Sequence, residues 1–150
     1  MGEIENKNPE PAKGLQYFGA VMASMGEAVQ EYQENPDGDL PINTVALCVD
    51  PIVEDETFQD YNEDGTEIIT FETGVQILIG HTIVVTTGGP HAEFRTFDNG
   101  ETYRFHYWDW FGSDEFSCGV YDDDLQTVQE AFGLYFDCLE DSQKAGAVIE

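Results

Sequence analysis

Carboxylates gather in one short stretch of this chain, where seven of them fall within residues 54–67. The seven are Glu54, Asp55, Glu56, Asp60, Glu63, Asp64 and Glu67. Oxygens at this density can coordinate a hard cation such as Ca²⁺, or they can present negative charge to a basic protein surface. A second acidic group, Asp122, Asp123 and Asp124, directly precedes a stretch with helical periodicity.

The segment from Asp60 to Gly65 matches the first half of a calcium loop, with Asp60, Asn62 and Asp64 supplying oxygens at alternating positions. The second half departs from that pattern. Its twelfth position holds Phe71 in place of a bidentate Glu, and Glu72 comes one residue late. A solvated acidic turn is the favoured interpretation, calcium is kept as an alternative, and no other cofactor is expected.

The whole chain is strongly acidic, with 31 Asp and Glu against 5 Lys and Arg and a formal net charge of -26. Lys and Arg are absent between Lys13 and Arg95, and again between Arg104 and Lys144. A fold of this size is about 38 Å across, and a duplex of that length carries about 22 charges. Such a surface repels nucleic acid and anionic membranes and attracts basic proteins.

A disordered acidic tail is excluded, because 41% of the residues are hydrophobic and 13% are aromatic. The three cysteines, Cys48, Cys118 and Cys138, are odd in number and widely spaced. They fit a reducing cytoplasm, in which they pack as small buried hydrophobes. Neither a membrane-spanning run nor a secretory leader is evident, so the expected location is the cytoplasm.

Catalytic patterns are weak. Residues 86–90 are glycine-rich but lack the Lys and Ser/Thr of a phosphate-binding loop. His81, His91 and His106 belong to no nucleophile or metalloprotease motif, and the spacing gives no support to a dyad of Cys118 with His106. We therefore expect no enzymatic activity.

Two stretches have the apolar spacing of amphipathic helices. The first covers residues 13–34, and its stripe is Leu15, Phe18, Met22, Met25, Val29 and Tyr32. The second runs from Asp123, the expected N-cap, to Leu139. Its stripe is Leu125, Val128, Phe132, Tyr135, Phe136 and Leu139.

Strand-like runs lie between these helices. We expect a buried strand at residues 42–49, an acidic loop at 54–67, an irregular segment at 112–123, and an antiparallel meander of about five strands. The five runs are residues 67–71, 75–79, 82–87, 92–97 and 102–110. The predicted fold is α+β, with an N-terminal and a C-terminal helix packed against the meander. One domain, residues 13–139, lies between flexible ends at 1–12 and 140–150.

Asn99-Gly100 is a strong signal for a two-residue hairpin turn. It places Arg95 opposite Arg104, where like charges destabilise by a few tenths of a kcal/mol, and it places Glu93 opposite His106. The arginines should recruit a carboxylate, Glu93 or Asp109, and are interpreted as structural rather than catalytic. Strand alternation assigns a core face, made of Ala92, Phe94, Thr96, Tyr103, Phe105 and Tyr107.

Residues 103–111 are the densest aromatic run. Proteins that stack bases on such rings do so within basic grooves, and cations are scarce in this chain. Most of these rings are expected in the core, and Trp108 and Trp110 are the ones assigned to a protein interface.

Three stretches of this chain resemble a family of small, acidic, largely uncharacterised proteins of phages and plasmids. They are Ile83-Val-Val-Thr-Thr-Gly-Gly-Pro90, Trp108-Asp-Trp-Phe111 and Phe132-Gly-Leu-Tyr-Phe136. Residues 111–116 depart from the Thr-Pro-Trp-like segment expected after Asp-Trp. The resemblance assigns no residue a role. It implies a setting, since mobile elements carry inhibitors of host defence, among them anti-CRISPR and anti-restriction proteins that mimic DNA.

The sequence therefore predicts an acidic DNA mimic that occupies the nucleic-acid groove of a basic host protein, a defence nuclease or a CRISPR effector. The contact groups would be the seven carboxylates of 54–67 together with Asp122, Asp123 and Asp124. Three alternatives stay open: a halophilic protein, which would need salt to fold, a calcium-binding module, and an inhibitor of a host transcription protein. Direct binding of nucleic acid or membrane is not expected, and the oligomeric state is open, with a dimer among the options.

Overall fold

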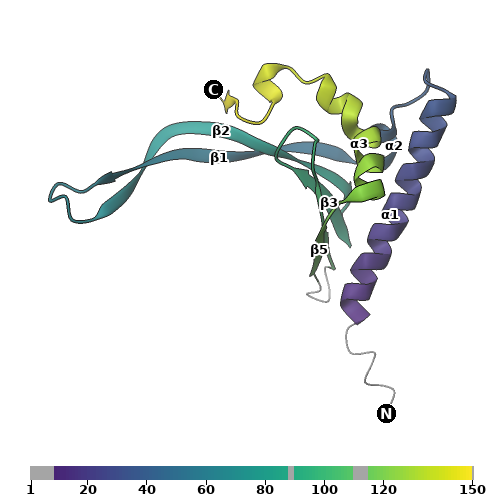
Figure 1. Cartoon of the computed structure of the whole chain (residues 1–150), viewed down its shortest axis with the longest axis horizontal. Coiled ribbons are helices and arrows are strands. Elements are labelled where there is room, and N and C mark those ends of the chain that lie inside the picture. Colours follow the sequence, from purple (N-terminus) through teal and green to yellow (C-terminus); the bar gives the residue numbers. More distant parts are fainter. Residues whose placement is uncertain (1–8, 88–89, 110–114, 150) are drawn as a thin grey trace, which may run out of the picture.

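The first predicted helix is α1 (Pro9–Glu34) in the computed structural model, which describes residues 9–87, 90–109 and 115–149. It begins at Pro9 rather than at residue 13. Residues 1–8, the rest of the end predicted to be flexible, lie outside the described residues. Figure 1 shows α1 running along one side of the molecule.

The buried stripe of α1 differs from the predicted stripe at its two ends, where Leu15 is exposed and Tyr32 is half-buried. Phe18 and Met25 are buried as expected, but Leu15 is 56% exposed. The stripe begins instead at Gly14, where a Cβ atom would collide with the Phe116 side chain. Since successive residues of a helix point about 100° apart, the close approach of Gly14 turns Leu15 toward solvent.

Residues 42–49, predicted as a buried strand, divide between a short helix and the start of a strand. Helix α2 (Pro41–Val45) begins at Pro41, whose fixed φ suits the first turn of a helix. Strand β1 (Cys48–Tyr61) follows. Ile42 still enters the core, at 5% exposure, because a short apolar run can be buried as helix or as strand.

The predicted acidic loop at 54–67 is wrong. These residues form the outer part of β1, a turn, and the approach to strand β2 (Ile68–Thr86), and the two strands pair antiparallel. Three separate strands were predicted across β2 because its glycines resemble breaks. Gly74, with φ of +83°, lies instead at a shift of the register, as glycine in a β-bulge does.

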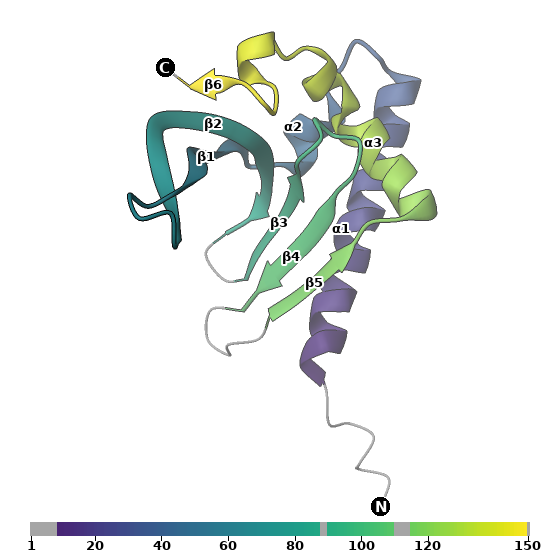
Figure 2. The ribbon, with the colours of Figure 1, turned by 60° about the vertical axis from the view of Figure 1, so that its left-hand side comes forward.

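The sheet has the order β1-β2-β3-β4-β5, with antiparallel neighbours throughout, so the predicted α+β meander is confirmed. Its remaining strands are β3 (His91–Thr96), β4 (Arg104–Trp108) and β5 (Glu115–Gly119). Strand β5 replaces part of the segment that was expected to be irregular. Helices α1 and α3 (Asp122–Asp137) cover the same face of the sheet (Figures 1 and 2). Tyr121 is the N-cap of α3, so Asp123 lies inside the helix and the predicted cap is wrong.

The hairpin between β3 and β4 has the predicted register, with Arg95 opposite Arg104 and Glu93 opposite His106. Asn99 and Gly100 have φ of 58° and 91°, the sign that this two-residue turn requires at both positions. All six residues assigned to the core face are buried, with exposures of 4% or less. The alternation of side chains along paired strands thus predicts this part of the core correctly.

Aromatic rings fill the space between the sheet and the helices. Phe94, Phe105 and Phe132 are fully buried, from β3, β4 and α3 respectively. The ring centroid of Phe94 lies 5.2 Å from that of Phe105 and 5.8 Å from that of Phe132, in edge-to-face arrangements that add to the energy of burial. This core is what holds the fold against its own negative charge.

The chain end predicted to be a flexible tail, residues 140–150, is paired with the sheet in its described part. After α3 come a short 3-10 helix, η2 (Asp141–Gln143), and strand β6 (Val148–Ile149), which pairs with Gln76 and Ile77 of β2. The backbone of Leu78 donates to Ala147 at 2.9 Å and accepts from Gly146 at 2.7 Å. The C-terminal segment therefore supports β2 where it leaves the core.

The stability of the fold should decrease as the pH falls from 7 toward 5.5. His81 is buried, and its Nε2 donates to the Gln143 carbonyl at 2.9 Å, while its Nδ1 has no partner among the described residues. Burial lowers the pKa of His81 below its ordinary value. An unfolded histidine titrates near pH 6.5, so below that pH the unfolded state binds more protons and the free energy of unfolding decreases.

Thermal melts of the wild type and of His81→Leu at both pH values check this expectation. Burial and the charge of Arg95 lower the pKa of His106 as well, so the variant should keep part of the pH dependence and lose the part due to His81. An equal pH dependence in the two proteins would contradict the assignment to His81.

The cysteines differ from their predicted burial. Cys48 and Cys138 are exposed and Cys118 is half-buried, and all three are free thiols. Burial raises the pKa of Cys118 and of Cys48, the latter also through Asp50. Both thiols are therefore weaker nucleophiles than an ordinary cysteine at neutral pH.

Of the helices in the described ranges, none has the length and apolar character needed to cross a membrane.

Candidate functional site

Strands β1 and β2 continue past the core as a two-stranded projection, which we call the arm and define as residues 53–77. Figures 1 and 2 show it extending away from the sheet on the side opposite the helices. Every residue from 53 to 74 is exposed except Asn62, which is half-buried. Most of the arm therefore contacts only itself and solvent.

The arm has the charge density of a single nucleic-acid strand. Residues 53–77 contain eight carboxylates and no Lys, Arg or His. At the usual rise of a strand, the path from Val53 to the turn is about 30 Å long. Over that length one DNA strand has about 9 phosphates and a duplex about 18. The charge of the arm thus matches one strand of DNA and is about half that of a duplex of the same length.

Seven of the ten predicted contact residues lie on the arm, and the sheet brings them together. They are Glu54, Asp55, Glu56, Asp60, Glu63, Asp64 and Glu67. Sequence reasoning missed the eighth carboxylate, Glu72, which lies opposite Thr57 on the partner strand. The pairing of 54–67 with the run after it would have found Glu72, but that pairing was not recognised.

The other three predicted contact residues are not part of this surface. Asp122, Asp123 and Asp124 form the first turn of α3. In both Figure 1 and Figure 2 this end of α3 lies on the far side of the core from the arm. Carboxylates at this position interact favourably with the positive end of the helix dipole. This interaction gives them a structural role in α3.

Within the described part of the chain, the hydrogen-bond partners of the arm's carboxylates are all neutral. Thr73 Oγ1 donates to Glu56 Oε1 at 3.0 Å, and Gln76 Nε2 donates to Asp55 Oδ1 at 3.3 Å. Of the ion pairs found in residues 13–87, 90–109 and 115–149, none includes an arm carboxylate. The arm therefore presents uncompensated negative charge to any partner.

Asn62, one of the three predicted calcium ligands, stabilises the turn of the arm. Its Oδ1 accepts the backbone N–H of Thr66 at 2.9 Å, and its Nδ2 donates to Thr66 Oγ1 at 3.3 Å. Gly65 follows with φ of +72°. Within the described ranges there is no group of three or more His, Cys, Asp and Glu placed to hold a metal ion. The calcium hypothesis stays a prediction, in competition with this turn.

The arm also exposes large apolar side chains, which sequence reasoning did not assign to a site. Their exposures range from 38% to 61%. The six are Val53, Phe58, Tyr61, Ile68, Ile69 and Phe71. Phe58 lies opposite Phe71 across the two strands, with ring centroids 5.3 Å apart and ring planes at 21°. A two-stranded ribbon that contacted only water would not require exposed apolar side chains.

The two arginines alternate with the core residues of β3 and β4 and so lie on the opposite, open face of the sheet. Arg95 Nε donates to Glu93 Oε2 at 2.5 Å, His91 Nε2 contacts Glu93 Oε1 at 2.7 Å, and the Arg95 guanidinium lies 5.7 Å from the centre of the Trp108 ring. Glu93 itself is only 6% exposed, so it compensates Arg95 locally. These contacts fit the structural interpretation of Arg95. Asp109, the alternative partner, forms an ion pair with Lys13 at 3.0 Å.

Of the two tryptophans predicted at a protein interface, the structure describes only Trp108. Trp108 is half-buried, and its Nε1 donates to Glu115 Oε1 at 3.1 Å, while Trp110 lies outside the described residues. A role of Trp108 at a protein interface stays a prediction.

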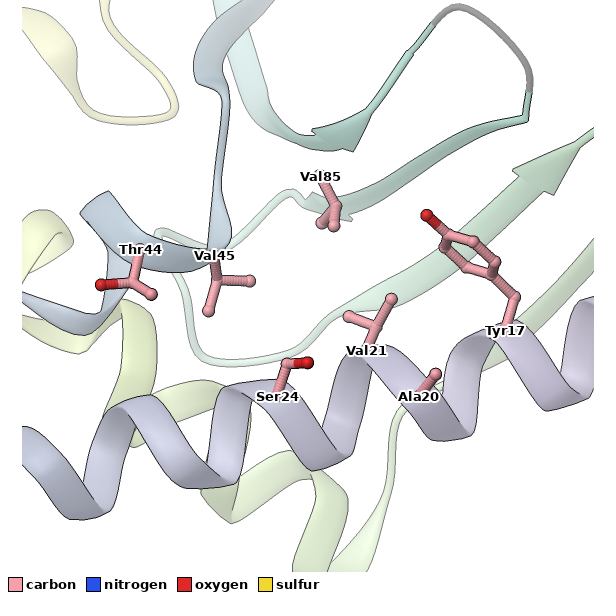
Figure 3. Close-up of a pocket in the computed structure, with 7 residues that line it drawn as sticks. All are labelled: Tyr17, Ala20, Val21, Ser24, Thr44, Val45 and Val85. Carbon is pink, nitrogen blue, oxygen red and sulfur yellow. The ribbon is translucent and has the colours of Figure 1, made fainter.

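A separate cavity of about 320 Å³ lies between α1, α2 and β2 (Figure 3). Its lining side chains are mostly apolar, and their polar groups are the hydroxyls of Tyr17, Ser24 and Thr44. The lining residues are Tyr17, Ala20, Val21, Ser24, Thr44, Val45 and Val85. Because the lining contains no Asp, Glu, Lys, Arg or His, the cavity offers no counterpart to the acidic arm.

Comparisons with models of protein families, with curated proteins and with solved structures find no match to this chain. The resemblance to acidic phage and plasmid proteins stays a prediction, and the function has to be argued from the geometry of the arm.

Proposed function

We propose that this protein is an acidic inhibitor that places its arm in the nucleic-acid-binding groove of a basic host protein and excludes the nucleic acid. The setting implied by the resemblance to phage and plasmid proteins is a mobile element acting in the host cytoplasm. The targets that fit this setting are a defence nuclease or a CRISPR effector. The protein would act by occupancy, without catalysis and without a bound cofactor.

The observation that carries this proposal is the uncompensated charge of the arm. Eight carboxylates project from the core on one element, with no cation among them. A basic groove lined by Lys and Arg is complementary to such an element, and that complementarity accelerates encounter and selects the partner. The core and the C-terminal strand β6 hold the base of the arm, which projects away from the sheet.

Competition with DNA for a captured partner tests the proposal. Immobilised protein is incubated with nuclease-treated bacterial lysate, the bound protein is purified, and its affinity for labelled DNA is measured with and without this chain. We expect mutually exclusive binding, with the affinity for this chain falling at least about tenfold between roughly 50 and 200 mM salt. A partner that binds DNA and this chain at the same time, with no response to salt, would contradict the proposal.

A further inference from the structure

The arm carries two kinds of exposed group, and charge explains only one of them. The stacked pair Phe58 and Phe71 lies on one face of the outer arm, and Tyr61 with its cross-strand partner Ile68 lies on the other. All four side chains are at least 40% exposed. Asp60 is two residues from Phe58, on the same face, so rings and carboxylates alternate along the arm.

Single-stranded nucleic acid presents the same combination of groups. In a duplex the bases are stacked inside and phosphates dominate the contacts, so a duplex-binding site has little use for exposed rings. A site for single strands joins a basic groove for the backbone to aromatic side chains on which bases stack. Each aromatic platform in such a groove could accept a ring of the arm in place of a base.

The charge density favours the same choice. The arm's eight carboxylates lie along about 30 Å, near the 9 phosphates of one strand and well below the 18 of a duplex. An arm that imitated a duplex would need about twice this charge.

A second copy of this chain is a poorer occupant for the arm's surface. Each copy has a net charge of -26, so two copies repel. On the open face of the sheet, where both arginines lie, Arg95 is already compensated by buried Glu93. Charge complementarity therefore selects a basic partner.

We propose that the arm imitates single-stranded nucleic acid, and that its partner's site is a basic groove with aromatic platforms that binds single-stranded DNA or RNA. This inference rests on the proposed function and names the class of site that the arm would occupy.

Displacement from the captured partner distinguishes the two classes of nucleic acid. The complex on immobilised protein is washed in parallel with a mixed-sequence single strand and with the duplex of the same sequence, at equal phosphate concentration. We expect the single strand to release the partner at a concentration at least about tenfold lower than the duplex, since only the single strand offers bases to the platforms.

Ring-removing variants supply the second readout. Phe58→Ala with Phe71→Ala should weaken partner binding by about tenfold for each ring lost. Phe58→Tyr with Phe71→Tyr keeps the rings and should bind as the wild type does. A matched control, Phe97→Ala with Tyr121→Ala, removes two exposed rings outside the arm and should change the affinity less than about twofold.

The outcomes separate this inference from the proposed function. If the duplex releases the partner as well as the single strand does, or if the Phe58 and Phe71 double alanine variant binds normally, the single-strand inference is wrong and the acidic inhibitor remains. If neither nucleic acid releases the partner, both are wrong.

Discussion

Replacing three carboxylates at the end of the arm should weaken partner binding by about 30-fold or more. The variant is Asp60→Asn, Glu63→Gln and Asp64→Asn, which changes the net charge from -26 to -23. Charge pairs in an interface contribute from under 1 to several kcal/mol each. Three pairs at about 0.7 kcal/mol each already give 30-fold. The affinity is measured by titration calorimetry with the captured partner.

The control removes the same charge from another place. Asp122→Asn, Asp123→Asn and Asp124→Asn also give a net charge of -23, but they lie at the start of α3, away from the arm. We expect a change in affinity below about twofold, since exposed charges farther apart than a Debye length are largely screened. Asn tolerates the positive φ of Asp122. Equal losses in the two variants would show that bulk charge, and not the arm, drives binding.

The largest effect on stability is expected from Phe132→Ala. Phe132 is fully buried, and its ring centroid lies 5.8 Å from that of Phe94 and 5.9 Å from that of Tyr103. Truncating a buried Phe to Ala costs about 3–5 kcal/mol through lost burial and the cavity that remains. Domains are stable by only about 5–15 kcal/mol, so this loss is a large fraction of the total free energy of unfolding. Urea unfolding measures it.

Leu134→Ala on the same helix is the matched control for Phe132→Ala. Leu134 is 39% exposed, and its truncation should lower the free energy of unfolding by less than about 1 kcal/mol. Similar losses at the two positions would contradict the placement of the core.

Because the charges of the chain repel one another, added salt should stabilise the wild type, Phe132→Ala and Leu134→Ala alike through screening.

Local signals were sufficient to predict the hairpin of β3 and β4 and most of both long helices. Asn99-Gly100 specifies the turn, and the turn specifies the register down to Arg95 opposite Arg104. The stripe through Val128, Phe132 and Phe136 specifies the buried face of α3. In each case residues close together in the sequence determine the local structure, so a single sequence is enough to predict it.

The long pairing of β1 with β2 was not predicted, because its outer part lacks the pattern of a half-buried strand. Glu54 to Tyr61 have no apolar-polar alternation that matches a core face, since neither face is buried. An acidic composition then favours a loop. The strand is defined by its partner, through contacts such as Phe58 with Phe71, and those are visible only after the chain has folded.

The candidate site was therefore predicted in composition but not in shape. The sequence identified seven of the arm's carboxylates and missed both the arm and its exposed rings. It also joined Asp122, Asp123 and Asp124 to the same surface, which the position of α3 separates from the arm. Charge along a chain can be counted, whereas which charges share a surface depends on tertiary pairing.

Amide hydrogen exchange of this chain, alone and bound to its captured partner, tests most directly whether the arm enters the partner's groove. A ribbon that contacts only itself should exchange quickly in the free protein. We predict slowed exchange across residues 53–75 in the complex and no comparable change at residues 122–128. Protection confined to α3 or to the open face of the sheet, with arm amides exchanging as fast as in the free protein, would contradict the account.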